Sequence, residues 1–208
     1  WKMPFNGDGM IAGIADNEED FYLSIQRGVL YKMKLDNTGA ATAFQRMDPA
    51  AADSTNYRWK NPMTMDENND NVLYWSERNK IWRHNTLSSI PYNNSNDKSN
   101  FGWDFFSDSL QTQMDITTLN SSVNPPDILY FGTSSKYMYR IDNASVGDPP
   151  KSILTGPPTG SNSFTADIAI NPLDANEIIC VYSNYSVYSL FHSLDGGQSW
   201  EKIAGNLE

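Results

Sequence analysis

The chain has 208 residues, of which 12% are aromatic and only 19% are charged. The frequent aromatic residues exclude a disordered chain, and the many turn-forming residues favour an all-β fold over a helical bundle. The formal net charge of −10 argues against a nucleic-acid partner and against binding to an anionic membrane surface. No apolar run is long enough for a transmembrane helix, so we expect no membrane insertion.

Four repeats of one unit are predicted along the chain. Each repeat has a leading strand, followed by two strands of alternating apolar residues that a short polar turn joins. The leading strands are predicted at Met10–Ala15, Trp59–Met65, Asp115–Leu119 and Ala166–Asn171. The strand pairs are predicted at Phe21–Ser24 with Val29–Lys34, Val72–Ser76 with Lys80–His84, Ile128–Thr133 with Lys136–Ile141, and Ile178–Tyr182 with Ser186–His192.

An aromatic residue marks the second strand of every pair. These residues recur roughly every 50 to 60 positions, at Tyr31, Trp82, Tyr139 and Phe191. Such a period fits the four-stranded antiparallel blade of a β-propeller. We therefore predict an all-β chain with four blades, over residues 9–50, 57–108, 112–156 and 164–206. Residues 1–8 have the same pattern as the end of the fourth repeat, which predicts the outermost strand of a preceding or closing blade.

Two insertions are longer than the other predicted turns, at Leu87–Asp108 and Asn143–Ser163. Long loops on a rigid scaffold commonly carry binding residues. Trp103 and Phe105 lie in the first insertion, and we expect them to be candidates for stacking on a sugar ring or a peptide side chain. Packing within the fold is their alternative role.

A compact motif lies near the end of the chain, in the sequence Ser193-Leu-Asp195-Gly196-Gly197-Gln-Ser199-Trp200. Glycines supply backbone angles that a tight turn needs and that other residues avoid. A short Asp carboxylate accepts hydrogen bonds from the amides of its own turn, and hydroxyl groups extend the same network. The Trp ring covers this hydrogen-bonded turn with apolar surface. The motif therefore predicts a self-contained hairpin turn.

This motif resembles the Asp-box, or BNR repeat, of β-propellers, a superfamily that contains sialidases, xyloglucanase-type glycoside hydrolases and Vps10/sortilin ectodomains. In that family the box joins the third and fourth strands of a blade. The segment Asn124–Thr133 is similar to a second element of the family, whereas the corners at Asp36–Gly39, His84–Thr86 and Asp142–Ala144 carry degenerate or absent boxes. The resemblance implies structural roles for Ser193, Asp195, Gly197, Ser199 and Trp200.

The resemblance also implies that the four blades belong to a larger propeller, completed by other segments or chains. A closed four-bladed ring is the alternative. The chain begins at Trp1 without a recognisable signal peptide, so we expect a mature or truncated segment of a longer polypeptide. The family context implies an extracellular or cell-surface location.

Glycoside hydrolysis is the first chemistry that the family suggests, and it needs two carboxylates that face each other. Asp115 and Asp167 lie at comparable positions in two leading strands, which line the central channel of a propeller, so they are the catalytic candidates. Capping of turns is their alternative role. Sialidase chemistry would need a cluster of arginines, whereas Arg83 and Arg140 occupy equivalent positions in separate repeats.

One segment has the spacing of a calcium loop. Asp66, Asn68 and Asp70 occupy every second position, as the first three side-chain ligands of a calcium-binding loop do. The Gly and the distal Glu of such a loop are missing. A turn between strands is the favoured interpretation, and we expect no metal and no cofactor.

These observations predict a non-catalytic module that binds protein or polysaccharide. One alternative is a fragment of a glycoside hydrolase, and another is a structural subunit of a larger assembly. Two carboxylates close together in a cleft would indicate the enzyme. An exposed aromatic patch would indicate the binding module, and large apolar surfaces on the two terminal blades would indicate the assembly subunit.

Overall fold

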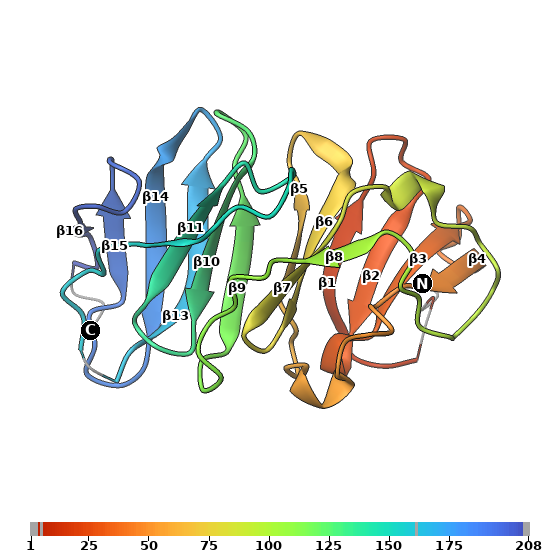
Figure 1. The fold of residues 1–208 in the computed structure, drawn as a ribbon, viewed down its shortest axis with the longest axis horizontal. Coiled ribbons are helices and arrows are strands. Elements are labelled where there is room, and N and C mark those ends of the chain that lie inside the picture. Colours follow the sequence, from red (N-terminus) through yellow and green to blue (C-terminus); the bar gives the residue numbers. More distant parts are fainter. Residues whose placement is uncertain (1–3, 5, 161, 206–208) are drawn as a thin grey trace. The chain divides into compact units, whose positions relative to one another are not determined.

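The computed structural model describes residues 4, 6–160 and 162–205. These residues form two compact units. The first unit comprises residues up to Met65 together with Asn69–Glu77 and Ile81–Phe105, and the second comprises the rest of the chain. Each unit holds two four-stranded antiparallel sheets, as predicted (Figure 1).

The sheets of the first unit are built from consecutive strands in simple order, β1-β2-β3-β4 and β5-β6-β7-β8. The strands of the first sheet are β1 (Gly9–Ile14), β2 (Phe21–Ile25), β3 (Leu30–Leu35) and β4 (Ala41–Arg46). Those of the second are β5 (Met63–Asp66), β6 (Asn69–Glu77), β7 (Lys80–His84) and β8 (Trp103–Phe105).

The second unit repeats this plan, with the orders β9-β10-β11-β12 and β13-β14-β15-β16. Its third sheet contains β9 (Ile116–Ser121), β10 (Ile128–Thr133), β11 (Met138–Asp142) and β12 (Ser152–Ile153). Its fourth contains β13 (Phe164–Asn171), β14 (Asp174–Ser183), β15 (Leu190–Ser193) and β16 (Glu201–Lys202). The four aromatic residues that mark the repeats all lie in the third strand of their sheets.

Helical structure among the described residues is limited to three single turns of 3-10 helix, at Gln26–Gly28, Ser54–Asn56 and Leu87–Ser89. None of the helices described in the structure is long and apolar enough to cross a membrane. The prediction for residues 1–8 falls largely outside the described residues, since 1–3 and 5 are not among them, and it stays a prediction.

Apolar side chains fill the space between the two sheets of each unit. In the first unit, Trp75 and Tyr22 are almost fully buried in a cluster that also holds Trp103. In the second, Tyr130, Tyr182 and Phe191 belong to one buried cluster. Burying a large apolar side chain contributes about 1.5–3 kcal/mol, so these aromatic residues dominate the stability of each sheet pair.

The insertion between β7 and β8 packs against the first sheet instead of extending into solvent. Ser95 forms an isolated parallel bridge with Gln45 of β4, and the Lys32 ammonium group donates to the carbonyl groups of Leu87 and Ile90 at 3.0 and 3.3 Å. The Tyr92 hydroxyl group donates to the Asp20 carboxylate. The insertion is therefore part of the folded unit.

Candidate binding surfaces

The motif at Ser193–Trp200 forms a turn closed by its own side chains. The Asp195 carboxylate accepts hydrogen bonds from the amides of Gln198 and Ser199 at 3.0 and 2.8 Å, and from the Ser199 hydroxyl at 2.5 Å. The Ser193 hydroxyl donates to Asp195 at 2.8 Å and accepts from the Gly197 amide at 2.9 Å. Gly196 and Gly197 have φ of 70° and 89°, a region that glycine enters readily.

Two consequences follow from this turn. The hydrogen bonds that Ser199 and Ser193 give to Asp195 lower the pKa of its carboxyl group to about 2, so the carboxylate stays charged down to acidic pH. The Trp200 indole donates to the carbonyl group of Thr155 at 2.6 Å, which ties the turn to the segment that follows β12. The turn joins β15 to β16, the third and fourth strands of their sheet.

The two candidate catalytic carboxylates each have structural partners. Asp115 lies 3.3 Å from the Arg78 guanidinium group. Asp167 accepts a hydrogen bond from the Thr118 hydroxyl at 2.8 Å and one from the Ile168 amide at 2.9 Å. These contacts fit the alternative role, in which both side chains hold turns and strands.

The three candidate calcium ligands also bond within the protein. Asp66 accepts from the Asn68 amide at 2.9 Å, and the Asn68 side chain donates to the Ser122 carbonyl at 2.9 Å. Asp70 accepts from the Asp16 amide at 3.0 Å. No group of three or more His, Cys, Asp or Glu side chains suited to a metal ion occurs within the described part of the chain.

Trp103 requires a correction. Its side chain is only 8% exposed, and its indole donates to the Met47 carbonyl at 2.7 Å, so its ring packs in the core and is not available to a ligand. Phe105, two residues later, is 51% exposed and contacts Trp82 at a ring separation of 5.2 Å. Side chains two positions apart in a strand lie on the same face, so the difference comes from their place along β8. Trp103 packs in the buried cluster of the first unit, whereas Phe105 is the last residue of the strand.

Tyrosine side chains border an open groove in the second unit, which the sequence analysis did not single out. Pro158, Thr159 and Gly160 form one wall, and Ser186, Val187 and Tyr188 form the other, around about 480 Å³. Tyr188 is 42% exposed, and the preceding Tyr185 is 95% exposed. The Lys202 ammonium group covers the Tyr188 ring at 3.3 Å from its centroid. Lys202 therefore occupies one face of the Tyr188 ring, and the groove lies beside that ring.

The groove has a defined shape because its walls bond to each other. The Thr159 hydroxyl donates to the Tyr188 carbonyl at 3.4 Å, the Asn184 side chain donates to the Asn162 carbonyl at 2.6 Å just beyond the walls, and the buried Val187 anchors the second wall. A Cβ atom at Gly160 would lie 3.0 Å from Val187, so glycine permits this close approach. Tyr188 belongs to the predicted strand Ser186–His192, whereas in the structure it lies in the loop between β14 and β15, since β15 begins only at Leu190.

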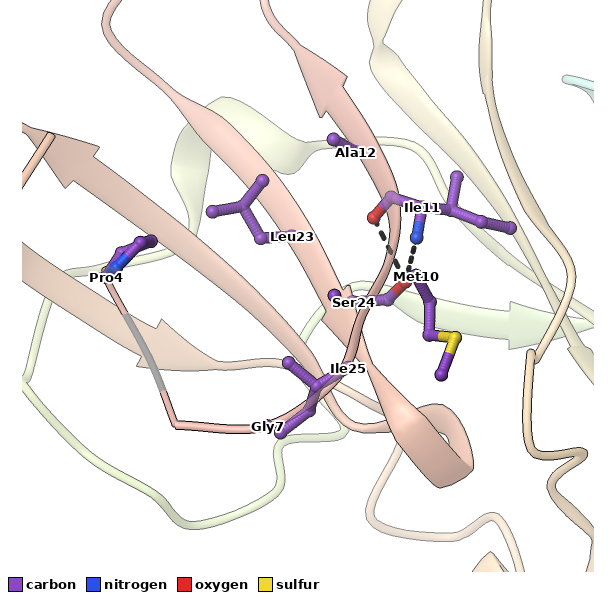
Figure 2. A pocket seen from close by; sticks show the side chains of 9 residues that line it. Pro4, Gly7, Met10, Ile11, Ala12, Leu23, Ser24 and Ile25 are labelled. Atoms are coloured by element: carbon purple, nitrogen blue, oxygen red, sulfur yellow. Dashed lines mark hydrogen bonds between the residues drawn. The ribbon is translucent and has the colours of Figure 1, made fainter. Parts of the chain in front are cut away.

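A second hollow, of about 280 Å³, opens on the first sheet between β1, β2 and the segment at Pro4 and Gly7 (Figure 2). Its side chains include Leu23 and Ile25, and none of its nine lining residues is titratable. The register of β1 and β2 shifts between Gly9 and Ala12, and there the Ser24 hydroxyl bonds both the amide and the carbonyl of Ile11, as the dashed lines in Figure 2 show. The hollow fits an apolar side chain and cannot supply acid–base chemistry.

No family model matches the chain, and no curated protein sequence matches it. Among solved structures, the chain is similar to the GH74 enzyme of Niastella koreensis, with a TM-score of 0.63 and 14% identity, over 95% of this chain and 30% of that one. It is also similar to the C-terminal WD40 domain of Sif2, with a TM-score of 0.57 and 11% identity, over 93% of this chain and 48% of that one.

Both structures are propellers, and at these identities the likeness concerns the fold alone. Together with the four antiparallel sheets, it confirms the prediction of an all-β propeller fold with four blades in this chain. The chain spans less than half the length of either structure.

Proposed function

We propose that the chain is a non-catalytic β-propeller module that binds a polysaccharide or a protein. The observation that supports this function best is the groove beside Tyr188, because exposed aromatic rings on rigid loops offer a ready stacking surface. Stacking on such rings needs little ordering of the protein on binding, since the loop backbone is already bonded in place.

The contacts of Asp115 and Asp167 support a binding role over a hydrolytic one. A carboxylate that acts as acid, base or nucleophile must face its substrate, whereas these two bond to Arg78 and Thr118. The glycoside hydrolase alternative rests on the likeness in fold to the GH74 enzyme.

We further propose that the chain belongs to the Asp-box propellers, on the strength of the turn at Ser193–Trp200, in which Ser193 and Ser199 bond to the Asp195 carboxylate. The proposed location is extracellular or at the cell surface, as that resemblance implies. The apolar hollow on the first sheet supports a larger propeller, because a further sheet could place an apolar side chain there.

The binding function is tested with purified chain and a panel of plant and bacterial polysaccharides, by affinity electrophoresis and calorimetry. Replacing Tyr188 by Ala should weaken binding about tenfold, since a lost stacking contact is equivalent to about 1.4 kcal/mol. Tyr188→Phe keeps the ring and should bind almost as the wild type does. Leu173→Ala, at a residue that is 78% exposed in the β13–β14 turn, is the position control.

Equal binding by Tyr188→Ala and the wild type would remove the groove from the proposal. Release of reducing ends from any bound polysaccharide, abolished by Asp115→Asn or Asp167→Asn, would instead favour the enzyme alternative. The Asn variants preserve shape while removing the charge, so they separate catalysis from folding.

A further inference from the structure

An exposed tryptophan lies beside an arginine side chain in the first unit. Trp59, in the loop that leads into β5, is 55% exposed, and the Arg27 guanidinium group lies 5.8 Å from the centre of its ring. The flanking residues in the sequence are Arg58 and Lys60. We name Arg27, Trp59 and Lys60 the Trp59 patch. This grouping is notable in a chain whose formal net charge is −10.

The backbone holds this patch in place. The Arg27 amide donates to the Trp59 carbonyl at 2.9 Å, which fixes the β2–β3 turn against the loop before β5. Gly28 follows with a φ of 70°, and a Cβ atom there would overlap the Tyr57 ring, so the two segments approach as closely as glycine allows. Tyr57 in turn packs edge-on against the buried Trp75, at 5.9 Å between ring centres.

The other side of the loop is equally constrained. Asn61 is buried, accepts from the Arg58 amide at 3.0 Å and donates to the Ser76 carbonyl of β6 at 2.7 Å. Trp59 therefore projects from a loop that is anchored on both sides. A ligand that stacks on it meets a fixed ring, and little entropy is lost in ordering the loop.

The charges of the patch are available for a ligand. Among the residues that the structure describes, neither Arg27 nor Lys60 forms an ion pair with a carboxylate. Other exposed cations are engaged, as Lys34 is with Glu19 at 2.8 Å. The planar guanidinium group of an arginine can donate two parallel N–H hydrogen bonds to a carboxylate or sulfate group, and the ammonium group of a lysine adds a second positive charge.

We infer that the Trp59 patch is a binding site for an acidic polysaccharide, whose sugar ring stacks on the indole while Arg27 and Lys60 bind its carboxylate or sulfate groups. The inference rests on the proposed binding function and names a ligand class for a second surface. Stacking of one apolar sugar face requires the flat exposed ring that Trp59 offers.

Two other classes of ligand fit less well. A nucleic acid needs an extended basic surface, whereas the Trp59 patch offers only the two cations Arg27 and Lys60. An acidic peptide that adds to a sheet edge needs free backbone groups, whereas the Arg27 amide and the Trp59 carbonyl already bond to each other.

The experiment measures binding of polygalacturonate, dextran sulfate and neutral dextran to the purified chain at low and high salt. We expect both acidic polymers to bind and neutral dextran to bind at least about tenfold more weakly. Added salt should weaken the binding of the two acidic polymers. Polygalacturonate and dextran sulfate distinguish carboxylate from sulfate as the preferred group.

Four variants assign the binding to the patch. Trp59→Ala and Arg27→Asn should each lower the affinity for the preferred acidic polymer about tenfold, and Lys60→Gln should lower it a few-fold. Asn tolerates the φ of 58° at position 27, so that change removes charge without backbone strain. Lys34→Gln, which removes an engaged cation, is the control and should leave binding unchanged.

Wild-type affinity in Trp59→Ala and Arg27→Asn would overturn the assignment, as would equal binding of neutral dextran. Equal, Trp59-dependent binding of poly-glutamate would overturn it in favour of an acidic peptide. Tyr188→Ala separates the two proposals, because it tests the groove and leaves the patch intact. Binding lost only in Tyr188→Ala would retain the proposed function and reject this inference.

Discussion

Burial keeps the imidazole of His84 neutral. The side chain is fully buried against Trp103, and burial lowers its pKa from 6.5 to about 4. Its Nδ1 accepts a hydrogen bond from the Thr86 amide at 3.1 Å, which requires the unprotonated nitrogen. His84 thus packs in the core and accepts one hydrogen bond through Nδ1. It lies at the end of β7, where the sequence carries a degenerate Asp-box.

This burial predicts a loss of stability in mild acid. Between pH 6.5 and 4 the unfolded chain binds a proton at His84 that the folded chain does not, so stability is complete above the unfolded pKa and falls as the pH is lowered. The expected loss between pH 7 and pH 5 is about 2 kcal/mol. Urea unfolding of the wild type at both pH values measures it.

His84→Asn keeps a hydrogen-bond acceptor but does not titrate, so its stability should change little over the same pH range. His192→Asn removes the other histidine, which is only partly buried, and should retain the drop. A drop of wild-type size in His84→Asn would show that another group is responsible.

At the level of elements, Lys32 of β3 holds the insertion to the first sheet. Its side chain is 1% exposed, and its ammonium group lies 3.4 Å from the Asp20 carboxylate and donates to the Leu87 carbonyl at 3.0 Å. The Tyr92 ring lies 4.9 Å from the same group. The ammonium group satisfies carbonyl groups of a short 3-10 helix that would otherwise be buried without a donor.

Replacing Lys32 by Met should destabilise the first unit by about 3 kcal/mol, since it removes the cation that faces the buried Asp20 carboxylate and the donor to the Leu87 and Ile90 carbonyl groups. Amide hydrogen exchange should become faster in the insertion, from Leu87 to Asn100, before it changes in β2 and β3. Lys34→Met is the control, because this cation two residues along β3 is partly exposed, pairs with Glu19 and lies farther from the Tyr92 ring, at 5.8 Å; it should change the exchange much less than Lys32→Met does. Unaltered exchange in Lys32→Met would contradict this role.

The strands were predictable because two-residue alternation and polar turns are local signals. The sequence also located the insertion, but the burial of Trp103 depends on how Ser95 and Lys98 pack against distant strands, which no local pattern reveals. The first strand of the second sheet begins at Met63 rather than Trp59, because Pro62 lacks an amide hydrogen and the Asn61 side chain replaces it in bonding to β6.

The candidate sites were harder to predict than the fold. Asp115 and Asp167 are acidic residues at suggestive positions, yet their roles depend on Arg78 and Thr118, which are remote in sequence. The Tyr188 groove arises from two loops about 30 residues apart, and only folding brings them together. Residue type and spacing therefore indicate the architecture well and the chemistry poorly.

At the scale of the molecule, the fourth sheet has apolar residues on both faces. Ile178 and Cys180 of β14 face the core, whereas Ile179, between them, is 36% exposed and shares its face with Val181 and Leu190. An antiparallel sheet with one face in water normally carries polar residues there. The same face also carries Asp167 and the Glu177–His192 pair, so Ile179, Val181 and Leu190 form an apolar strip between polar side chains.

We expect the isolated chain to self-associate through this face at micromolar concentrations, as judged by sedimentation velocity. Ile179→Lys should weaken the association, because it buries a charge in the contact. Leu173→Lys makes a similar change at a turn of the same sheet and should have no effect. A chain that stays monomeric at high concentration, or equal behaviour of the two variants, would contradict the expectation.

The closure of the Asp195 turn has a consequence for counting repeats. The hydrogen bonds described above for its carboxylate all come from within eight consecutive residues, and the turn is tied to other segments by the Trp200 indole and by the Gly196 amide, which donates to the Asn176 carbonyl at 2.8 Å. The sequence of such a turn can therefore be lost from one repeat while the strands on either side are kept. The sheet of β5–β8 is an example, because a longer insertion joins its third and fourth strands. The number of intact turn motifs of this kind in a sequence is therefore a minimum for the number of blades that it encodes.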